Sequence, residues 1–394
     1  MPIHATFSPP TVVHESFNGQ HAWFSSVLNA QRGVLIVAMS LGGDGTPCPP
    51  PGKPPQNCTM AQLSRDNGVS WAPFEDWSKS GANEVEGLAS HNGSYFTFPY
   101  SVNVDYTTNK SATSVDHVAH VDKTANRVVF DSHYTSTWEA GDEVEWPDRL
   151  VHSGSVVRLS DDSYLTTMYG HGAGGYRNWT KKSAVYFMRA TADADGVPRT
   201  WKQLSEIPWR SEYGEHADGP GEPSTARLAS GRLMCIFRSD ARQYYYAATS
   251  DSDGRTWTEP TPLGSWSVKP RLRVMRQTGI VVLTGGRPGI NLWASADEGV
   301  SWERFNLAEV HNGLVANTSL QYDAQVVNAS GPRDHTALPT PQTSSYTGLV
   351  EADDGALVVS YDRIANGWHG PPGVWGDADT LFTMRVALSC PDLP

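Results

Sequence analysis

Arginine, tyrosine and carboxylate side chains recur in this sequence where short apolar segments begin or end. Glu222 in GEPS precedes Arg238 in CIFRS by sixteen residues, and Arg287 follows in GGRPG. Tyr346 directly precedes the apolar run TGLV. Arginines bind carboxylates, whereas glutamate and tyrosine act as acids, bases or nucleophiles. Two arginines ending neighbouring strands would repel each other unless an anion binds between them, so the set predicts chemistry on an anionic substrate.

A second group of reactive residue types lies in the segment MYGHGAGGYR, which contains Tyr169, His171 and Arg177. His152 lies on the preceding apolar segment, and Tyr361 ends the last one, in VVSYDR. A neutral histidine is a suitable general base because its ordinary pKa lies close to working pH, and a tyrosine can supply the proton. We expect His171 to act as base, and Tyr169, His152, Tyr361 and Arg177 to bind substrate.

These residues are carried by a repeated unit of two apolar strands around a Gly or Asp turn. The paired strands read HAWFSSVLNAQRGVLIVAMS, HSGSVVRLSDDSYLTTMYG, EPSTARLASGRLMCIFRS, RLRVMRQTGIVVLTGG and YTGLVEADDGALVVSYDR. A sixth unit is predicted from Gly87 to Phe130. Repeated hairpins of this kind are typical of propeller blades.

Asp/Gly turns closed by tryptophan accompany the repeats. SRDNGVSW (Ser64 to Trp71) and SADEGVSW (Ser295 to Trp302) match S-x-D-x-G-x-[ST]-W, the Asp box. SDSDGRTW (Ser250 to Trp257) is a near match, with Ser252 in place of the aspartate, and DADGVPRTW is a stretched one. The carboxylate can accept backbone hydrogen bonds across the turn, while glycine takes the positive-φ position. Asp boxes are structural and carry no chemistry.

The sequence therefore predicts an all-β chain, a single β-propeller domain over residues 1–394 with four-stranded antiparallel blades. Six blades are expected, with seven as the alternative count, and the N-terminal segment should close the ring against the last blade. First-strand starts and second-strand ends should share one face. The residues expected there are Trp23, Phe24, Glu84, Glu86, His152, Glu222, Lys269, Arg271, Tyr346, Asp44, Tyr100, Tyr169, His171, Arg177, Arg238, Arg287, Tyr361, Asp362 and Arg363.

From Glu222 to Arg363 the chain resembles the sialidase superfamily, in which a Glu opens one blade and a Tyr opens the last. The resemblance implies that Tyr346 is a nucleophile polarised by Glu222, and that Arg238 and Arg287 hold a carboxylate. The first half departs from the family pattern: Trp23-Phe24-Ser25-Ser26 stands where sialidases carry Arg-Ile-Pro. Asp44 is only a weak match to the family's acid/base aspartate. Loss of one clamp arginine puts standard sialic acid hydrolysis in doubt.

The histidine-rich third unit and the missing arginine are similar to features of fungal rhamnose–glucuronate lyases that act on gum arabic. This resemblance implies β-elimination at glucuronate with release of terminal L-rhamnose, and no cofactor or metal. Arg238 and Arg287 would then stabilise the enolate-like anion. The main alternative is a sialidase-like exo-glycosidase with Tyr346 as nucleophile. The third interpretation is a glycan-binding propeller that cleaves nothing.

Composition limits the partners. The net charge is -12 and no Lys or Arg run is long enough to grip nucleic acid. No apolar stretch approaches a membrane span. N-x-[ST] triplets begin at Asn57, Asn92, Asn109, Asn178, Asn317 and Asn328, which favours a secreted, extracellular glycoprotein. We expect a monomer that binds an acidic oligo- or polysaccharide, a Cys48–Cys58 disulfide, a buried Cys235 and a free Cys390 in the tail.

Overall fold

The computed structural model divides the chain into two compact units. Unit 1 comprises Met1–Val85 and Met275–Pro394, and unit 2 comprises Glu86–Val274. The structure describes residues 2–16, 20–30, 32–42, 59–74, 87–89, 94–98, 101–105, 107–108, 110–122, 124, 127–142, 144, 146–147, 149–170, 183–213, 219–239, 244–332, 342–368, 370 and 378–391.

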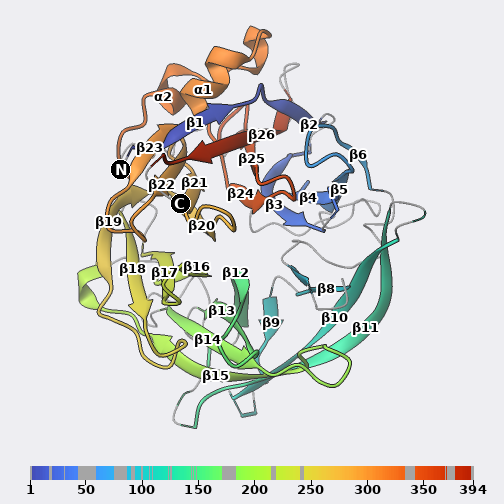
Figure 1. The fold of residues 1–394 in the computed structure, drawn as a ribbon, viewed down its shortest axis with the longest axis vertical. Coiled ribbons are helices and arrows are strands. Elements are labelled where there is room, and N and C mark those ends of the chain that lie inside the picture. The colour runs from blue at the N-terminus through green and yellow to red at the C-terminus, as the bar shows by residue number, and fades with distance from the viewer. Residues whose placement is uncertain are drawn as a thin grey trace. The chain divides into compact units, whose positions relative to one another are not determined.

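Unit 1 consists mainly of antiparallel sheets (Figure 1). One sheet has the order β3-β4-β5-β6, formed by β3 (Trp23–Asn29), β4 (Leu35–Ser40), β5 (Thr59–Ser64) and β6 (Ala72–Pro73). Another has the order β1-β26-β25-β24, with β2 also on β26; its strands are β1 (His4–Phe7), β2 (Thr11–Ser16), β24 (Gly348–Glu351), β25 (Leu357–Arg363) and β26 (Asp379–Ser389). β21 (Val281–Gly286), β22 (Ile290–Ser295) and β23 (Glu303–Asn306) pair in chain order.

The N-terminal segment joins the sheet of the C-terminal strands. β1 pairs antiparallel with β26 from His4↔Ser389 to Phe7↔Val386. β2 pairs with the other half of the same strand, from Thr11↔Thr383 to Ser16↔Asp379. The two ends of the chain are therefore held together by backbone hydrogen bonds.

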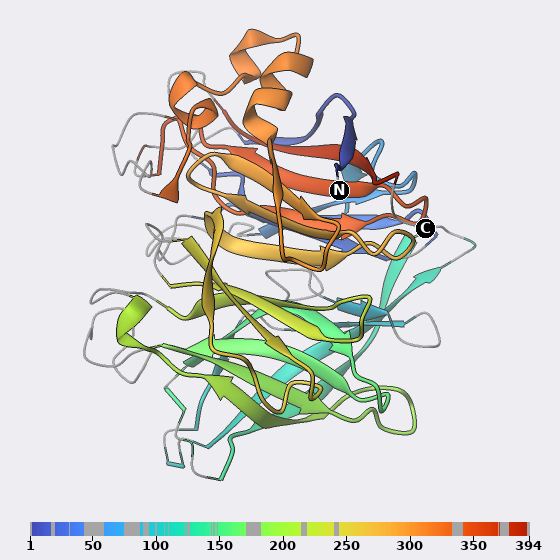
Figure 2. The same cartoon turned by 60° about the vertical axis from the view of Figure 1, so that its left-hand side comes forward.

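Short helices follow β23 in unit 1, where the sequence leaves room for extra strands. They are α1 (Leu307–Leu314), the 3-10 turn η4 (Thr318–Leu320) and α2 (Ala324–Val327), and they lie outside the sheets (Figure 2). Asn306 caps α1 by accepting a hydrogen bond from the Glu309 amide, and Leu307 packs into the core. No helix among the described residues is both long and apolar enough to cross a membrane.

Unit 2 contains a nine-stranded sheet with the order β7-β8-β10-β11-β15-β14-β13-β12-β9. Its strands are β7 (Gly87–Ala89), β8 (Ser94–Thr97), β9 (Ser101–Asn103), β10 (Ser111–Asp122), β11 (Arg127–Glu139), β12 (Arg149–Arg158), β13 (Tyr164–Gly170), β14 (Ala184–Ala190) and β15 (Thr200–Ile207). The 3-10 turn η3 (Ser211–Tyr213) leads to a four-stranded sheet of β16 (Gly221–Arg227), β17 (Leu233–Arg238), β18 (Tyr244–Ser250) and β19 (Thr261–Trp266). β20 (Val268–Val274) ends the unit.

The nine-stranded sheet differs from the separate blades that the repeats predict. The predicted sixth unit forms the antiparallel run β7-β8-β10-β11, but the end of β11 pairs in parallel with β15, from Thr137↔Thr200 to Glu139↔Lys202. β10 and β11 have 12 and 13 residues, so they are long enough to run past their own group and reach the next one. Two predicted blades therefore share one sheet.

The Asp boxes form the turns that their sequences predict. Asp66 accepts hydrogen bonds from the amides of Val69 and Ser70 at 3.1 and 2.9 Å, and Gly68 has a φ of 83°. Although burial opposes it, these hydrogen bonds and those of the Ser64 and Ser70 hydroxyls lower the pKa of Asp66. The box at Asp297 repeats the bond to Ser301 at 2.9 Å. The Asp boxes therefore stabilise these turns.

The near-match box at Ser252 keeps the same geometry with a hydroxyl. Ser252 Oγ accepts from the Thr256 amide at 2.9 Å, and Ser250 Oγ accepts from the Gly254 amide at 2.9 Å. Trp257 stacks on Phe187 of β14 with ring centroids 4.1 Å apart. A hydroxyl has less charge than a carboxylate, so this turn is held by weaker acceptors than the two complete boxes.

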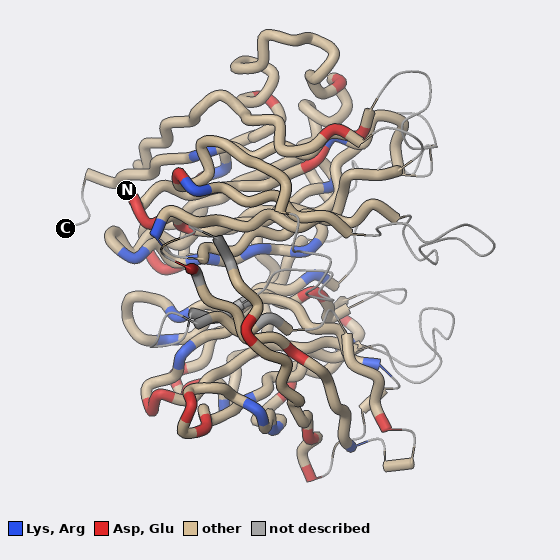
Figure 3. The backbone as a smooth tube through the Cα atoms, turned by 90° about the vertical axis from the view of Figure 1, so that its right-hand side faces the viewer, with Lys and Arg blue, Asp and Glu red and all other residues tan. Residues whose placement is uncertain are grey.

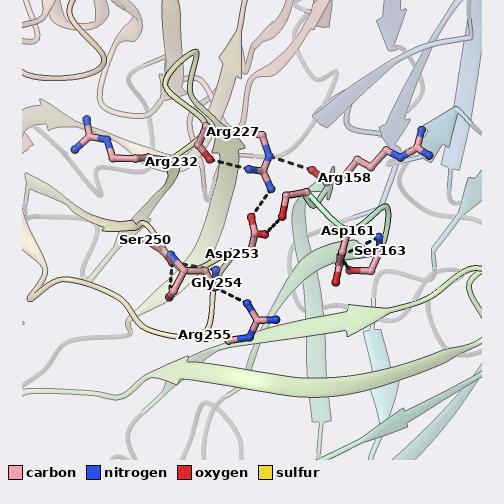
Figure 4. A network of polar contacts seen from close by, with 12 residues as sticks. Arg158, Asp161, Ser163, Arg227, Arg232, Ser250, Asp253, Gly254 and Arg255 are labelled. Atoms are coloured by element: carbon pink, nitrogen blue, oxygen red, sulfur yellow. Dashed lines mark hydrogen bonds and ion pairs between the residues drawn. The ribbon is translucent and has the colours of Figure 1, made fainter.

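The same turn anchors two sheets of unit 2 through a polar network (Figure 4). Arg227 donates to Asp253 Oδ1 at 2.7 Å and to the carbonyl oxygen of Arg158 at 3.1 Å, and Ser160 Oγ also donates to Asp253. These bonds fix the β12–β13 turn against β16.

Acidic and basic residues are mixed along the described backbone, and no continuous basic stripe is seen in this view (Figure 3).

Candidate functional site

Strained backbone marks the strand ends that carry reactive residue types. Four non-glycine residues there have positive φ: Phe24 at 53°, Glu222 at 50°, Lys269 at 43° and Arg287 at 39°. Other positive-φ residues, such as Arg32, Asn67 and Asp162, occur in hairpin turns, where this conformation is common. A bulky residue in this region costs about 1–3 kcal/mol and persists only where its surroundings enforce it, which is frequent at ligand sites.

A β-bulge accompanies the strain on two of these strands, β3 and β16. The register of β3 shifts between Trp23 and Ser26, and that of β16 shifts between Gly221 and Ser224. A bulge re-aims side chains at a sheet edge. The register of β12 also shifts, but there the left-handed residue is Gly154, where a Cβ would come within 2.7 Å of the Pro223 carbonyl oxygen. The third repeat thus cannot present a side chain at this position.

In unit 2, Glu222 and Arg238 form a buried ion pair, as their spacing suggests. Arg238 Nε lies 2.7 Å from Glu222 Oε2, and the side chains are 15% and 3% exposed. The same carboxylate oxygen accepts a hydrogen bond from the Lys269 backbone amide at 2.8 Å. Glu222 therefore binds a guanidinium from β17 and the start of β20 together. Breaking such a buried pair from one side commonly costs about 3–5 kcal/mol.

Two more cations are buried on β20 beside this pair. Lys269 is 2% exposed and Arg271 is 7% exposed. Ser224 Oγ accepts from the Leu272 amide at 3.0 Å and holds β20 against β16. Lysine and arginine are almost never buried without a compensating charge. Among the described residues, Arg238, Lys269 and Arg271 lie together with Glu222 at this edge of unit 2, and arginine and lysine are the residue types that bind anionic groups. We call these four residues the charged cluster.

Tyr245, in the run YYY of β18, closes the charged cluster from behind, and the sequence analysis missed it. Its hydroxyl donates to the Val268 carbonyl oxygen at 3.2 Å. Complete burial, and then the charge of Glu222, raise the pKa of Tyr245 well above its ordinary value. Tyr245 therefore stays a neutral phenol and serves as a hydrogen-bond donor, not as a nucleophile. In the sequence it is marked only by the run Tyr244-Tyr245-Tyr246, which does not say which of the three rings is buried.

In unit 1, the tripeptide Ser344-Ser345-Tyr346 organises a second set of candidate residues. Ser344 Oγ accepts from the Arg287 amide at 2.9 Å. Ser345 Oγ accepts from the Phe24 amide at 2.9 Å. Each serine thus holds one of the two strained residues of this unit in place, immediately before Tyr346.

Aromatic rings surround Tyr346. The rings of Phe24 and Tyr346 are 4.7 Å apart, and Trp368 contacts Phe24 at 5.4 Å. The guanidinium of Arg287 lies 3.6 Å from the centroid of the Trp368 ring. Phe24, Tyr346, Trp368 and Arg287 are all half-buried, whereas Trp23, 4.8 Å from Trp368, is buried beneath them. We call Phe24, Tyr346 and Trp368 the aromatic shelf.

Buried carboxylates lie beneath the aromatic shelf. Asp362 Oδ1 accepts from the Ser345 amide at 2.6 Å, and Ser345 Oγ donates to Asp362 Oδ2. Burial raises the pKa of Asp362 to about 7, with a smaller contribution from the charge of Asp379. Asp379 itself lies 2.8 Å from His21 Nδ1, and the His21 ring stacks on Trp23 at 3.9 Å. A titratable network therefore supports the shelf from the core side.

Two predicted binding residues of the third repeat are buried in unit 2. His152 is 4% exposed, bonds Thr166 Oγ1 through Nε2 at 2.8 Å and stacks on Phe98 at 5.0 Å. Tyr169 is 5% exposed and lies in β13 opposite Val151. His152 thus has the surroundings of a core histidine. Its predicted role on a ligand face gains no support from this placement.

Tyr361 has a packing role in unit 1. It is 0% exposed, its hydroxyl lies 3.0 Å from His311 Nδ1, and its ring lies 5.8 Å from that of Phe382. Complete burial raises its pKa well above the ordinary value. On β25 the side chains of Tyr361 and Asp362 point to opposite faces. The burial of Tyr361 gives no support to its predicted substrate-binding role, which stays a prediction, whereas Asp362 lies behind the shelf.

Several predicted residues fall outside the described part of the chain. They are His171, Arg177, Asp44, Glu84, Glu86, Tyr100, Cys48 and Cys58. Cys235 is free and completely buried, as predicted, and burial raises the pKa of its thiol to about 12. Cys390 is also free, but it is buried instead of lying in an exposed tail. The described residues contain no group of His, Cys, Asp and Glu arranged to hold a metal ion.

Unit 2 also has a concavity of about 420 Å³ at the turn ends of β12–β15, lined in part by Arg158, Asp161, Asp193 and Asp195. Its carboxylates are occupied by ion pairs: Arg199 lies 2.8 Å from Asp193 and 2.5 Å from Asp195. The hydrogen bond from Arg199 lowers the pKa of Asp195 to about 2. These ion pairs stabilise the turn between β14 and β15. The candidate site is therefore assigned to the opposite ends of the strands.

No protein-family model and no curated protein matches the chain. Solved structures do match. A protein of unknown function from Dyadobacter fermentans aligns over 98% of this chain and 99% of its own, with 13% identity and a TM-score of 0.59. The α-L-arabinofuranosidase Arb93A from Fusarium graminearum aligns over 97% of this chain and 98% of its own, with 11% identity and a TM-score of 0.53.

Trypanosoma rangeli sialidase, in its covalent intermediate with 2,3-difluorosialic acid, aligns over 97% of this chain with 11% identity and a TM-score of 0.54. The alignment spans 58% of that longer protein. At these identities the likeness concerns the fold alone. The chain therefore shares the sialidase-like fold that its Asp boxes and strand repeats predict.

Proposed function

We propose that this protein is a carbohydrate-active enzyme that cleaves a glycosidic bond at an acidic sugar of a complex glycan. The observation that carries the proposal is the charged cluster, in which Glu222 orients Arg238 and two more cations are buried on β20. Arginine and lysine side chains of this kind suit a sugar carboxylate. The shared fold supports the same class, because solved proteins with this fold include sialidases and an arabinofuranosidase.

Within this class, the hydrolase is supported best. Tyr346 would attack the anomeric carbon, and Arg287 would bind an anionic group of the substrate. The half-buried position of Tyr346, with Arg287 held by Ser344 and Phe24 held by Ser345, supports these roles. Glu222 would hold the guanidinium group of Arg238 in a fixed orientation, because preorganised hydrogen-bond donors stabilise charge on a substrate best where water is excluded.

The rhamnose–glucuronate lyase is the second candidate, and the same buried cations support it. β-Elimination needs a neutralised C6 carboxylate before the C5 proton can leave, and Arg238 and Lys269 are cations of the required kind. His171 is the proposed base, with Tyr346 or Tyr169 as acid. Because Tyr169 is buried and Tyr346 is half-buried, Tyr346 is the better-supported acid.

Product analysis tests the proposal. The protein is incubated with sialyl oligosaccharides, with gum arabic ending in rhamnose–glucuronate, and with arabinofuranosyl oligosaccharides. A hydrolase releases a free sugar and a new reducing end without ultraviolet absorbance, whereas a lyase also produces an unsaturated, ultraviolet-absorbing uronate. Binding of these glycans without any product would instead identify a glycan-binding protein and contradict the proposal.

We also propose that the protein is a secreted, monomeric glycoprotein. Asn317 and Asn328, the two described N-x-[ST] residues, are exposed, which supports modification there. Expression through a eukaryotic secretory pathway should give a protein whose mass falls after treatment with an N-glycan-removing endoglycosidase. No mass change would contradict this part of the proposal.

A further inference from the structure

The aromatic shelf has the composition of a sugar-binding surface. Its three rings are half-buried, so each keeps an accessible part, and they contact one another at 4.7 and 5.4 Å. An aromatic face offers a large rigid contact area at little cost in side-chain entropy. The C–H groups of a pyranose ring are the apolar part of an otherwise polar ligand, and they can pack against such a face.

Arg287 gives the shelf a charged edge. The guanidinium lies 3.6 Å from the centroid of the Trp368 ring. A stacked guanidinium keeps its N–H groups in its own plane, so its fork remains suited to a carboxylate. The left-handed backbone of Arg287 is held by the Ser344 hydroxyl at 2.9 Å, which fixes where the side chain leaves the strand.

One residue of the aromatic shelf stands where the sialidase pattern has a charged side chain. Phe24 lies in the segment in which that pattern has an arginine. Its φ of 53° persists although this backbone conformation costs free energy for phenylalanine. Two bonds enforce it: the Phe24 amide donates to Ser345 Oγ, and the Ser345 amide donates to Asp362. Asp362 is 0% exposed, and it contacts both Ser345 and the backbone amide of Phe24.

We propose that Phe24, Tyr346 and Trp368 stack against the ring of an acidic sugar beside Arg287, and that Asp362 positions this subsite through Ser345. The inference rests on the proposed function and extends it: the rings bind the ring face of the sugar, and the stacked Arg287 binds an anionic group of the same sugar. Asp362 is a positioning residue, because it is buried and its contacts here are with Ser345 and the backbone amide of Phe24.

Titration calorimetry with glucuronate and with N-acetylneuraminate tests the subsite. Trp368→Ala should weaken binding of the preferred sugar at least tenfold, and Phe24→Ala should have a similar effect. Trp368→Phe, which keeps a ring, should recover most of the affinity and remains informative if Phe24→Ala does not fold. Tyr244→Ala is the matched control, because Tyr244 is an aromatic residue that is 44% exposed in unit 2.

A double-mutant cycle tests the positioning role. Ser345→Ala should weaken binding about tenfold in the wild-type background but by less than twofold in the Phe24→Ala background, because its effect passes through Phe24. A merely structural serine would cost the same in both backgrounds. Asp362→Asn should show the same dependence on Phe24.

The outcomes separate this inference from the proposed function. Turnover of a glycan with unchanged affinity in Trp368→Ala and Phe24→Ala would overturn the subsite and leave the enzyme assignment intact. Sugar binding that depends on the shelf, with no turnover of any glycan, would overturn the enzyme assignment and leave the subsite intact. Failure of the wild-type protein to bind either acidic sugar would also overturn the subsite.

Discussion

The first strands of two sheets, β16 in unit 2 and β3 in unit 1, use one backbone device for different chemistry. Each has a bulge at its start with a left-handed residue, Glu222 on β16 and Phe24 on β3. Glu222 accepts an arginine and a backbone amide, whereas Phe24 packs against Tyr346. In β12 the left-handed residue is glycine, and no side chain is presented.

The same bulged position therefore recurs at the start of both strands, and the side chain at that position determines its chemistry. The bulge and its cost are the same in β16 and β3, but the charged residue requires buried ionic partners and the aromatic residue requires neighbouring rings. We therefore expect substitutions in the charged cluster to affect stability and activity together. Substitutions in the aromatic shelf should affect mainly binding and turnover.

Glu222→Gln should give the largest effect. The amide cannot neutralise Arg238, so a buried cation is left uncompensated, and the free energy of unfolding should fall by about 3–5 kcal/mol. Urea denaturation measures this. The double variant Glu222→Gln/Arg238→Met is the control and should recover much of the stability; a single variant as stable as the wild type would show that the pair contributes no net stability.

Tyr346→Phe should separate chemistry from packing. The ring that contacts Phe24 is kept while the hydroxyl is lost, so we expect turnover to fall at least about 100-fold, or about 2.7 kcal/mol, with little change in thermal stability. Tyr244→Phe, on the exposed part of β18, is the matched control. Near-normal turnover in Tyr346→Phe would exclude it as both nucleophile and acid.

Asp362→Asn should change how stability depends on pH. Burial raises the pKa of Asp362 from 3.8 to about 7, so the folded state binds more protons than the unfolded state between these values. The contribution of this pKa shift to the free energy of unfolding is therefore fully present below about pH 4 and is lost as the pH rises to about 7. The wild type should lose stability relative to Asp362→Asn over this window, as measured by thermal unfolding; parallel curves would contradict the shift.

Ser252→Asp should give the smallest effect, because it completes an Asp box whose geometry already exists. A carboxylate would accept the Thr256 amide bond more strongly than the hydroxyl does, which predicts about 0.5–1 kcal/mol of added stability. Asp66→Ser makes the reverse change in the first box and should destabilise by a similar amount. Equal stabilities in both pairs would show that the boxes contribute through glycine and tryptophan alone.

Local patterns predicted the fold well, because strand pairs such as β3–β4 and β16–β17 are adjacent in sequence and joined by recognisable turns. The repeat pattern placed Glu222 and Arg238 on one face, and the structure adds that they form an ion pair. The pattern did not predict the Ser345 contact with Phe24, since these residues are 321 positions apart and serine carries no strong signal. It placed both Tyr361 and Asp362 on the substrate face, although alternation directs their side chains to opposite faces of the strand.

The pattern of small polar residues also escaped the sequence analysis. Ser344 and Ser345 precede Tyr346 directly, yet their role appears only when their partners, Arg287 and Phe24, are placed beside them. The third-repeat residues His171 and Arg177 stay predictions. The sequence left open whether the segment from Asn312 to Ser345 holds extra strands; its described part holds the end of α1, η4 and α2, with caps such as Asn317.

The most direct test of the central claim, that the charged cluster and the aromatic shelf both serve cleavage at an acidic sugar, is product release from one glycan. Wild type, Arg238→Met/Glu222→Gln and Trp368→Ala are compared on the best substrate of the panel by chromatography of the released sugar. We predict release by the wild type and a loss of at least tenfold in each of the other two proteins, which remain folded. Full release by either of them would contradict the claim.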